Sequence, residues 1–297
     1  MAKCLVTGGC GFIGSNLVDK LVEEGHEVLV IDNESAETHD RFYYNSEAKY
    51  YKYDICDYTN TRPLYKGVEY VFHLAAESRI QPCVENPVMA VQTNTMGTAM
   101  VLQCSREAGV GRVMYSSTSS AYGLKNEPPL KEDMVEDCLN PYSVSKVAGE
   151  KLCKMYTDLF GLETISFRYF NVYGPRQPLR GQYAPVIGLF LRQWRDGEPL
   201  TIVGDGGQRR DFTHVNDVVE ANLICMKSGI PGELYNVGTG KNHSVLELAN
   251  MISNEIKFID PRPGEARVSL ADNVKLRMLG WDPTVTLESY IKEQKNG

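Results

Sequence analysis

The chain has 297 residues, of which 42% are apolar, and a formal net charge of −7, so its composition is that of a globular protein with a sizeable core. The acidic balance argues against a nucleic-acid-binding surface, and any anionic ligand must be met by a local group of basic residues. The eight cysteines contain no C-x-x-C pair, which argues against a zinc or thioredoxin-like site and indicates the reduced thiols of a cytoplasmic protein.

The first motif, TGGCGFIG, joins a short apolar run at 3–7 to a stretch of helical spacing at 12–24. In a strand–turn–helix unit of this kind, one glycine makes the tight turn, one lets a pyrophosphate approach the backbone, and one allows close helix packing. Gly8, Gly11 and Gly14 stand in these places, and the helix N-terminus would face the phosphates. Taken alone, the motif could also be a tight turn in any α/β protein.

The second expected strand, 27–31, is followed directly by Asp32. A carboxylate at this place can accept hydrogen bonds from the adenosine ribose hydroxyls of a bound dinucleotide. No Arg or Lys follows before Arg41, so the 2′-phosphate of NADP would meet Asp32 without a counter-charge. We therefore predict that the cofactor is NAD.

Further strand-like runs alternate with helical stretches, a pattern that predicts a doubly wound, Rossmann-like parallel sheet with helices on both faces. After Gly174, short segments separated by Gly- and Pro-rich turns indicate a smaller carboxyl-terminal lobe. We expect an NAD-binding domain over 1–173, with return segments near 214–240, and an interleaved substrate-binding lobe over 174–297. No apolar run is long enough for a signal peptide or a membrane span, so we expect neither. The expected strands lie at 50–53, 69–74, 111–116, 163–169 and 234–237, and the expected helices at 87–108 and 142–160.

Two strand ends carry residues that suit a flat cofactor. Asp54 and Ile55, after the third strand, could meet the adenine, or they could be a strand end followed by a helix cap. Ala75 and Ala76, after the fourth strand, would let a ring lie close to the backbone, or they could be a packed strand end.

The strongest chemical signal is the pair Tyr142 and Lys146, four residues apart on one expected helix face. A neighbouring ammonium favours the phenolate and lowers the pKa of a phenol, so that Tyr142 could exchange a proton with a substrate hydroxyl. Thr118, at the end of the expected strand 111–116, could share the same proton network, whereas Ser116 and Ser117 are either cofactor contacts or polar strand ends. Together with the glycine motif, these residues predict hydride transfer between a carbinol carbon and nicotinamide.

At this point the chain resembles the extended short-chain dehydrogenase/reductase family, and within it the UDP-sugar 4-epimerases. The resemblance covers essentially the whole length, with the motifs in family order and at family spacing. It is carried by TGGCGFIG, Asp32, DICD, HLAA, NTMGT (94–98), SSTSSAYG, YSVSK, RYFNVYGPRQ (168–177), GDGGQRRDFTHVNDV (204–218), NVGTG (236–240) and RPGEARVSLAD (262–272).

The resemblance implies that Thr118, Tyr142 and Lys146 are catalytic; many 4-epimerases carry Ser in place of Thr118, which keeps the hydroxyl. Of the basic residues in the second lobe, it favours Arg210 and Arg262 over Arg176 and Arg209 as partners of the nucleotide diphosphate, together with Asn171. The implied cofactor contacts are Gly8, Gly11, Phe12, Ile13, Gly14, Asp32, Asn33, Asp54, Ile55, Leu74, Ala75, Ala76, Asn94, Ser116, Tyr142, Lys146 and Tyr169. The implied substrate contacts are Ser78, Thr118, Asn171, Tyr183, Thr201, Val203, Arg210, Arg262, Glu265 and Ser269.

The reaction implied is reversible inversion at C4 of a UDP-sugar through a 4-keto sugar, with NAD retained and no metal. Uronate epimerases, uronate decarboxylases and 4,6-dehydratases are the alternatives within the family. The dehydratases typically follow the threonine with an Asp-Glu pair, where this chain has Ser119 and Ser120. A non-catalytic NAD-sensing protein is the alternative from another class, although it would be expected to lack Tyr142 or Lys146.

Two finer expectations come from the same resemblance. Ser269 corresponds to a pocket-wall position that carries Tyr in glucose-restricted 4-epimerases, so we expect room for an acetamido group at C2 of the sugar. Helices near 95–108 and 142–160 form the dimer interface in much of the family, which predicts a homodimer. The apolar residues of that interface would be Met100, Val101, Leu152, Met155 and Tyr156, although these could equally face the sheet.

Overall fold

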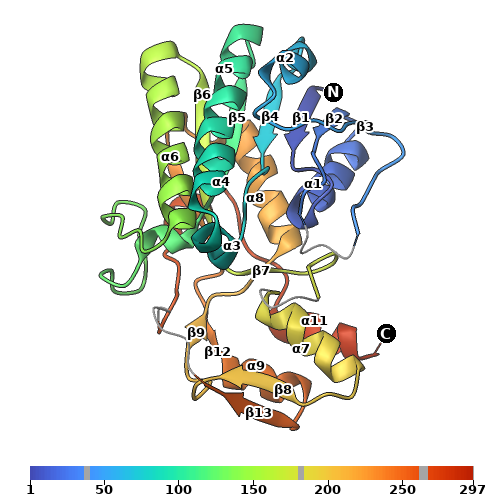
Figure 1. Cartoon of the computed structure of the whole chain (residues 1–297), viewed down its shortest axis with the longest axis vertical. Helices are drawn as coiled ribbons and strands as arrows, with labels where there is room; N and C mark the ends of the chain where they lie inside the picture. The colour runs from blue at the N-terminus through green and yellow to red at the C-terminus, as the bar shows by residue number, and fades with distance from the viewer. Residues whose placement is uncertain (37–40, 180–183, 261–266, 297) are drawn as a thin grey trace.

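A parallel sheet of seven strands forms the centre of the larger part of the molecule (Figure 1). The structure is a computed structural model, and it describes residues 1–36, 41–179, 184–260 and 267–296. The strand order β11-β6-β5-β4-β1-β2-β3 reverses direction at β1, which leaves a crevice at the carboxyl ends of β1 and β4. The strands are β1 (Lys3–Thr7), β2 (Glu27–Ile31), β3 (Lys49–Tyr51), β4 (Tyr70–His73), β5 (Arg112–Thr118), β6 (Glu163–Tyr169) and β11 (Leu234–Val237).

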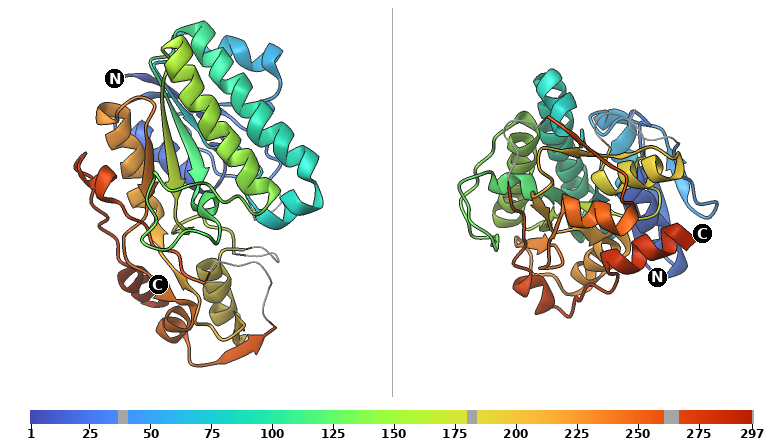
Figure 2. Two further views of the ribbon diagram at one scale, coloured as in Figure 1. Left: turned by 90° about the vertical axis from the view of Figure 1, so that its left-hand side faces the viewer. Right: turned by 90° about the horizontal axis from the view of Figure 1, so that it is seen from below.

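Helices cover both faces of this sheet, as the predicted doubly wound fold requires (Figure 2). Successive strand residues point to opposite faces, so Val6 of β1 packs with α1 (Phe12–Glu23) and α8 (Val215–Ser228). Leu5 packs on the other side, with α5 (Thr98–Ala108) and α6 (Pro141–Phe160). Because the strands are buried on both faces, they read in the sequence as nearly continuous apolar runs.

The helix expected at 87–108 is interrupted in the structure. It consists of α4 (Pro87–Val91), a π-helical turn η2 (Gln92–Gly97) and α5, and such wide turns are rare and hard to predict from sequence periodicity. The wide turn carries Asn94, whose side chain bonds to the backbone of Glu77 and to the hydroxyl of Ser145. The turn therefore ties the loop after β4 to α6.

Short helices complete the larger part of the molecule. Among the described residues, no helix is both long enough and apolar enough to cross a membrane. The short helices are α2 (Tyr58–Thr61), η1 (Arg62–Tyr65), α3 (Ile80–Glu85) and η3 (Ser119–Tyr122).

The smaller lobe has its own apolar core, in which Phe190, Leu248 and Ile291 from three helices are buried together. β8 (Leu200–Val203) pairs with β13 (Ile256–Ile259), and β9 (Arg209–Arg210) pairs with β12 (His243–Ser244). The pair of β7 (Val172–Tyr173) and β10 (Thr213–His214) lies at the crossing between the lobes. The helices of this lobe are α7 (Val186–Arg195), α9 (Val245–Ile252) and α11 (Leu287–Asn296), whereas α10 (Val274–Arg277) buries Leu276 in the core of the large sheet.

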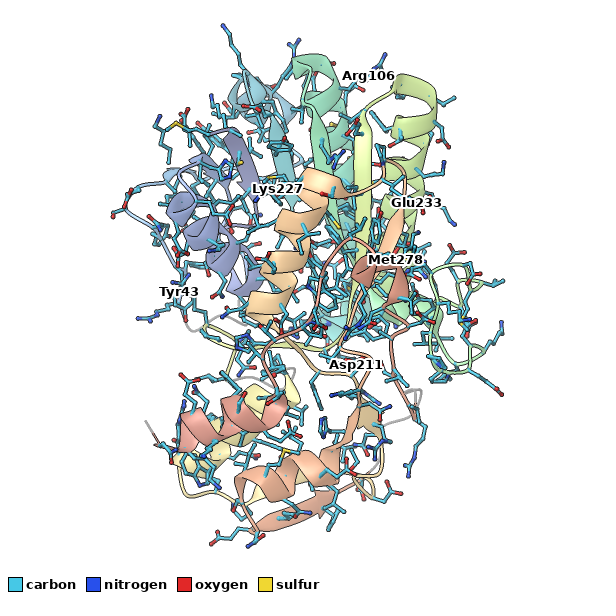
Figure 3. All side chains as sticks on the ribbon, turned by 180° about the vertical axis from the view of Figure 1, so that it is seen from behind. Tyr43, Arg106, Asp211, Lys227, Glu233 and Met278 are labelled. Carbon is cyan, nitrogen blue, oxygen red and sulfur yellow. The ribbon has the colours of Figure 1, made fainter. Side chains whose placement is uncertain are left out.

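The chain returns from the smaller lobe to the large sheet through α8 and β11. Asp211 lies at this crossing, as Figure 3 shows, and its carboxylate is fully buried. It accepts hydrogen bonds from the backbone N–H groups of Thr239, Gly240 and Ala271, at 2.8, 3.0 and 3.1 Å. The division of the chain into domains at 173 and 174 stays a prediction.

Candidate active site

A cavity of about 900 Å³ lies along the carboxyl ends of the parallel strands. Its floor is the glycine turn between β1 and α1. Gly8 has a φ of +73°, and a Cβ at that residue would lie 2.6 Å from the backbone nitrogen of Ala75. A Cβ at Gly14 would run into the carbonyl of Gly8, so both positions require glycine. Gly11, the N-cap of α1, has no side chain to cap the helix, which leaves the helix N-terminus open toward the cavity.

Asp32, directly after β2, lines this cavity. Its carboxylate accepts hydrogen bonds from the backbone N–H groups of Cys10, at 2.9 Å, and Glu34, at 2.8 Å. Asn33 donates to Asp54 at 3.0 Å, and both side chains line the cavity. The alternative of a strand end followed by a helix cap is confirmed for this stretch, because Asp57 caps α2, while Asp54 and Ile55 themselves line the cavity.

The Tyr142 and Lys146 side chains enter the cavity from the first turns of α6. This helix begins with Pro141 behind a capping box, in which Asn140 accepts a hydrogen bond from the N–H of Ser143. The cap fixes the start of the helix, so that residues one turn apart, Tyr142 and Lys146, both line the cavity.

The electrostatics of this pair differ from the expectation. Burial raises the pKa of the Tyr142 phenol, although a hydrogen bond with Thr118 and the charge of Arg79 act in the opposite direction. Burial also lowers the pKa of Lys146 to about 8. The prediction that the Tyr142 pKa is lowered is therefore wrong, because desolvation of the phenolate outweighs the effects of Thr118 and Arg79.

Behind the cavity wall, α6 is joined to β5 and β6 by a buried carboxylate. Glu150 accepts a hydrogen bond from Ser117 at 2.5 Å and two from Arg168, at 3.0 and 2.7 Å. Beside this network, the hydroxyls of Ser116 and Tyr169 lie 3.0 Å apart. These contacts fix the strand ends that carry Thr118 and Tyr169 against the helix that carries Tyr142 and Lys146.

A second cavity of about 410 Å³ continues from the first toward the smaller lobe. Arg210 lines this second cavity. By contrast, Arg176 pairs with Asp19 at 2.5 Å and Arg209 pairs with Glu247 at 3.1 Å. This arrangement agrees with the expectation that Arg210, rather than Arg176 or Arg209, contacts the nucleotide diphosphate. The two cavities meet at residues that line both of them: Ile80, Ser119, Ser120, Asn140, Asn171 and Ala184.

Most of the predicted site residues lie on these two cavities. Thr118, Tyr142, Lys146, Asn171, Ser78 and every predicted cofactor contact except Asn94 line the first; Asn171, Thr201, Val203, Arg210 and Ser269 line the second. Asn94 is fully buried and holds the loop after β4 from behind, which differs from its expected role as a cofactor contact. Tyr183, Arg262 and Glu265 lie outside the described residues. Within the described ranges, no cluster of three metal-ligating side chains occurs.

The sequence interpretation missed two features of the site. Arg79 lines the first cavity near Tyr142, and Glu150 carries the network behind it. Glu150 follows Lys146 by one helical turn, so helical spacing alone could have placed it on the same face. A lone arginine in the loop after HLAA gave no such signal.

Comparison with known proteins agrees with this geometry. Residues 4–238 match the model of the NAD dependent epimerase/dehydratase family. The chain is 38% identical to a putative UDP-glucose 4-epimerase of Methanocaldococcus jannaschii, over 98% of this chain and 97% of that protein.

Two solved structures superpose on nearly the whole chain. One is a UDP-glucose 4-epimerase of Thermotoga maritima with UDP-glucose, with a TM-score of 0.94, 36% identity, and coverage of 99% of this chain and 97% of that one. The other is a UDP-N-acetylglucosamine 4-epimerase of Methanobrevibacter ruminantium in complex with UDP-N-acetylmuramic acid, with a TM-score of 0.93, 32% identity and the same coverage.

Proposed function

This chain belongs to the NAD dependent epimerase/dehydratase family, and we propose that it is an NAD-dependent isomerase that inverts C4 of a UDP-linked hexose. One observation carries the proposal. Tyr142 and Thr118 line the cavity that holds the glycine turn, and their chain neighbours Asn140 and Ser119 lie where it meets a second cavity, which Arg210 also lines. A UDP-sugar in the second cavity would extend its hexose to that junction.

The residues of the first cavity suit NAD. The space that a Cβ at Gly8 would fill and the open N-terminus of α1 form a cradle for a pyrophosphate, and Asp32 can accept from the ribose hydroxyls. Lys146 and Tyr169 would hold the nicotinamide end. When bound there, NAD supplies a reversible hydride acceptor for the C4 carbon of the sugar.

In the proposed mechanism Tyr142 is the acid and base. As a phenolate, it takes the proton of the C4 hydroxyl while that carbon is oxidised, and it returns the proton when the 4-keto sugar is reduced on its other face. Thr118 shares the proton through its hydrogen bond with the phenol. The ammonium of Lys146, which lines the same cavity, would favour the phenolate. The small side chains of Ser119 and Ser120 line both cavities and leave room for the keto sugar to turn.

The same residues weigh against two alternatives. A 4,6-dehydratase needs an acid and a base to expel the C6 hydroxyl, and Ser119 and Ser120 can supply neither. A protein that only senses NAD has no need of a buried Tyr142 and Lys146 beside a second cavity. Epimerisation of a UDP-uronate is the same C4 reaction on another sugar, whereas decarboxylation of a UDP-uronate, which begins with the same oxidation at C4, stays an alternative.

We further propose that an acetamido group at C2 is accepted, so that UDP-N-acetylglucosamine and UDP-N-acetylgalactosamine are substrates. Ser269 lines the second cavity, and its backbone N–H bonds to the carbonyl of Arg209 at 3.0 Å. The backbone is thus fixed, and the size of this side chain decides how much room the cavity offers.

We also propose a homodimer, with interface residues that differ in part from those expected from the sequence. Val101 and Tyr156 are buried in the core beneath α5 and α6, so the alternative that they face the sheet holds for these two. Met96, on the turn η2 that precedes α5, and Leu159 and Phe160, at the end of α6, are exposed and support an apolar contact with a second copy.

The eight free cysteines support a reducing compartment such as the cytoplasm.

The experiment that tests the proposed function uses the purified protein without added cofactor. We expect NAD to be released on denaturation and the intact protein to interconvert the C4 epimers of at least one UDP-sugar, followed by chromatography. Bound NAD with no conversion of any UDP-sugar tested would leave only a binding protein.

A further inference from the structure

Arg79 is a cation without a partner in the wall of the first cavity. It stands in the loop between β4 and α3, its side chain is partly buried, and its Nε is fully buried with no hydrogen-bond partner among the described residues. A guanidinium stays protonated in proteins, so this is a buried positive charge rather than a neutral group.

A charge in this position is unfavourable unless an anion joins it. Burial lowers the pKa of Arg79, and the only titratable group that acts on it among the described residues is the phenol of Tyr142. Three carboxylates of the described residues line the cavity: Asp32 accepts from Cys10 and Glu34, Asp54 accepts from Asn33, and Glu77 is not among the groups that act on the charge of Arg79. An anionic group on a ligand would supply the missing acceptor.

The position of Arg79 indicates which part of the ligand this is. The next residue, Ile80, lines both cavities, and Tyr142 is the group proposed to act at C4 of the sugar. Asp32, at the proposed adenosine end, belongs to the carboxyl end of β2, across β1 from the strand that precedes Arg79. The cation thus faces the hexose end of the site.

We propose that Arg79 pairs with a carboxylate carried by the hexose, so that the preferred substrate is a UDP-hexuronate. The proposal rests on the proposed function and names its substrate class. The planar fork of a guanidinium matches a carboxylate through two parallel hydrogen bonds, which a hydroxymethyl group at C6 cannot accept in the same way. A neutral hexose would leave the buried charge of Arg79 unpaired, so the residue selects against it.

The test compares UDP-glucuronate with UDP-glucose in the holoenzyme, as the ratio of the two kcat/KM values for C4 epimerisation. Arg79 also acts on Tyr142, so its replacement can change proton transfer for both substrates. Such a common effect cancels in the ratio of the two kcat/KM values. The variants are Arg79→Met, which keeps the length without the charge, and Arg79→Lys, which keeps the charge without the fork. Arg106→Met, at the far end of α5 where the guanidinium stacks on Phe160, is the matched control (Figure 3).

We expect the wild-type ratio to favour UDP-glucuronate, and Arg79→Met to lower it by at least about 10-fold, with Arg79→Lys between the two and Arg106→Met unchanged. A wild type that prefers UDP-glucose, or a ratio that Arg79→Met leaves unchanged, overturns the proposal.

The pyrophosphate of NAD is the other anion with which Arg79 could pair. The amount of NAD bound per chain distinguishes this partner from a carboxylate on the sugar. If Arg79→Met loses NAD and lowers both kcat/KM values equally, Arg79 serves the cofactor and the proposal is overturned. If the wild type holds NAD but epimerises no UDP-sugar, the proposed function fails by itself. Calorimetric binding of UDP-glucuronate to NAD-loaded protein then decides: at least about 10-fold weaker binding by Arg79→Met supports the pairing, and equal binding overturns it.

Discussion

The ammonium of Lys146 lies 4.4 Å from the centre of the Tyr115 ring, above its face. The contact is a cation–π interaction in a buried place, which partly replaces the lost hydration of the charge. Burial nevertheless lowers the pKa of Lys146 to about 8, against the raising effects of the Cys153 thiol, the Glu150 carboxylate and Cys83. Burial, and next the charge of Lys146, lower the pKa of His73 on β4 to about 3.

The first prediction concerns the pH dependence of activity. Lys146 favours the Tyr142 phenolate only while it is protonated, so kcat/KM should fall as pH rises through the pKa of Lys146. Glu150→Gln removes a negative charge that raises this pKa, and the alkaline fall should move to lower pH. Glu107→Gln, on the exposed surface of α5, should leave it in place.

The same variant has a cost in stability. Glu150→Gln removes the nearer carboxylate, at 2.7 Å, from the buried Arg168 and leaves it only Glu136, at 3.7 Å. Losing one member of a buried pair typically costs about 3–5 kcal/mol, so this range is the upper limit here. We therefore expect a lower Tm together with the shifted pH profile. A lower Tm with an unchanged profile would mean that Glu150 only holds the strands together.

The second prediction assigns the acid and base. Tyr142→Phe keeps the ring and removes the hydroxyl, so folding and NAD retention should persist while epimerisation falls by at least about 100-fold. Tyr58→Phe, whose hydroxyl bonds to Glu107 on the surface, should keep full activity. Activity of Tyr142→Phe within threefold of wild type would refute the assignment.

The third prediction concerns the choice of cofactor. Asp32→Ala combined with Asn33→Arg removes the ribose acceptor and supplies a partner for a 2′-phosphate, so preference should shift toward NADP. Asn33→Arg alone is the control, because it keeps Asp32 and its hydrogen bonds to Cys10 and Glu34. The ratio of NAD to NADP affinity in refolded apoprotein measures the change; an unchanged ratio would make Asp32 a purely structural residue.

The fourth prediction concerns the room for a C2 substituent. Ser269→Tyr should lower kcat/KM for UDP-N-acetylglucosamine at least about 10-fold relative to UDP-glucose, because a ring would occupy space in the second cavity. Ser228→Tyr, at the exposed end of α8, is the size-matched control. Equal handling of the acetylated pair by Ser269→Tyr would show that another residue sets this limit.

The fifth prediction concerns the oligomeric state. Light scattering at micromolar concentration should give twice the 33.2 kDa of one chain. Met96→Lys combined with Leu159→Lys should yield monomers, whereas Met278→Lys, exposed on the opposite side near α10, should not (Figure 3). A wild-type monomer would contradict the proposal directly.

The sequence predicted those parts of the fold and site that depend on local pattern. The strands of the large sheet appear within one or two residues of their expected ends, since buried parallel strands are apolar runs bounded by turns. Tyr142 and Lys146 share a cavity because helical spacing and a capped helix start fix their direction. By contrast, the π-helical turn at 92–97 has no distinct periodicity. The contact of Lys146 with the Tyr115 ring depends on residues distant in the chain, as does the lack of a hydrogen-bond partner for the Arg79 Nε. Local sequence patterns therefore do not show either feature.

Asp211 has a mechanical consequence for the molecule. Its carboxylate holds the backbone after β11 and the segment at Ala271, while its own carbonyl accepts from the side chain of Asn171 at 3.0 Å. Three segments that cross between the lobes are thus joined at one residue. A shift of any one of them alone would break hydrogen bonds to Asp211, so movement between the lobes must carry these three segments together.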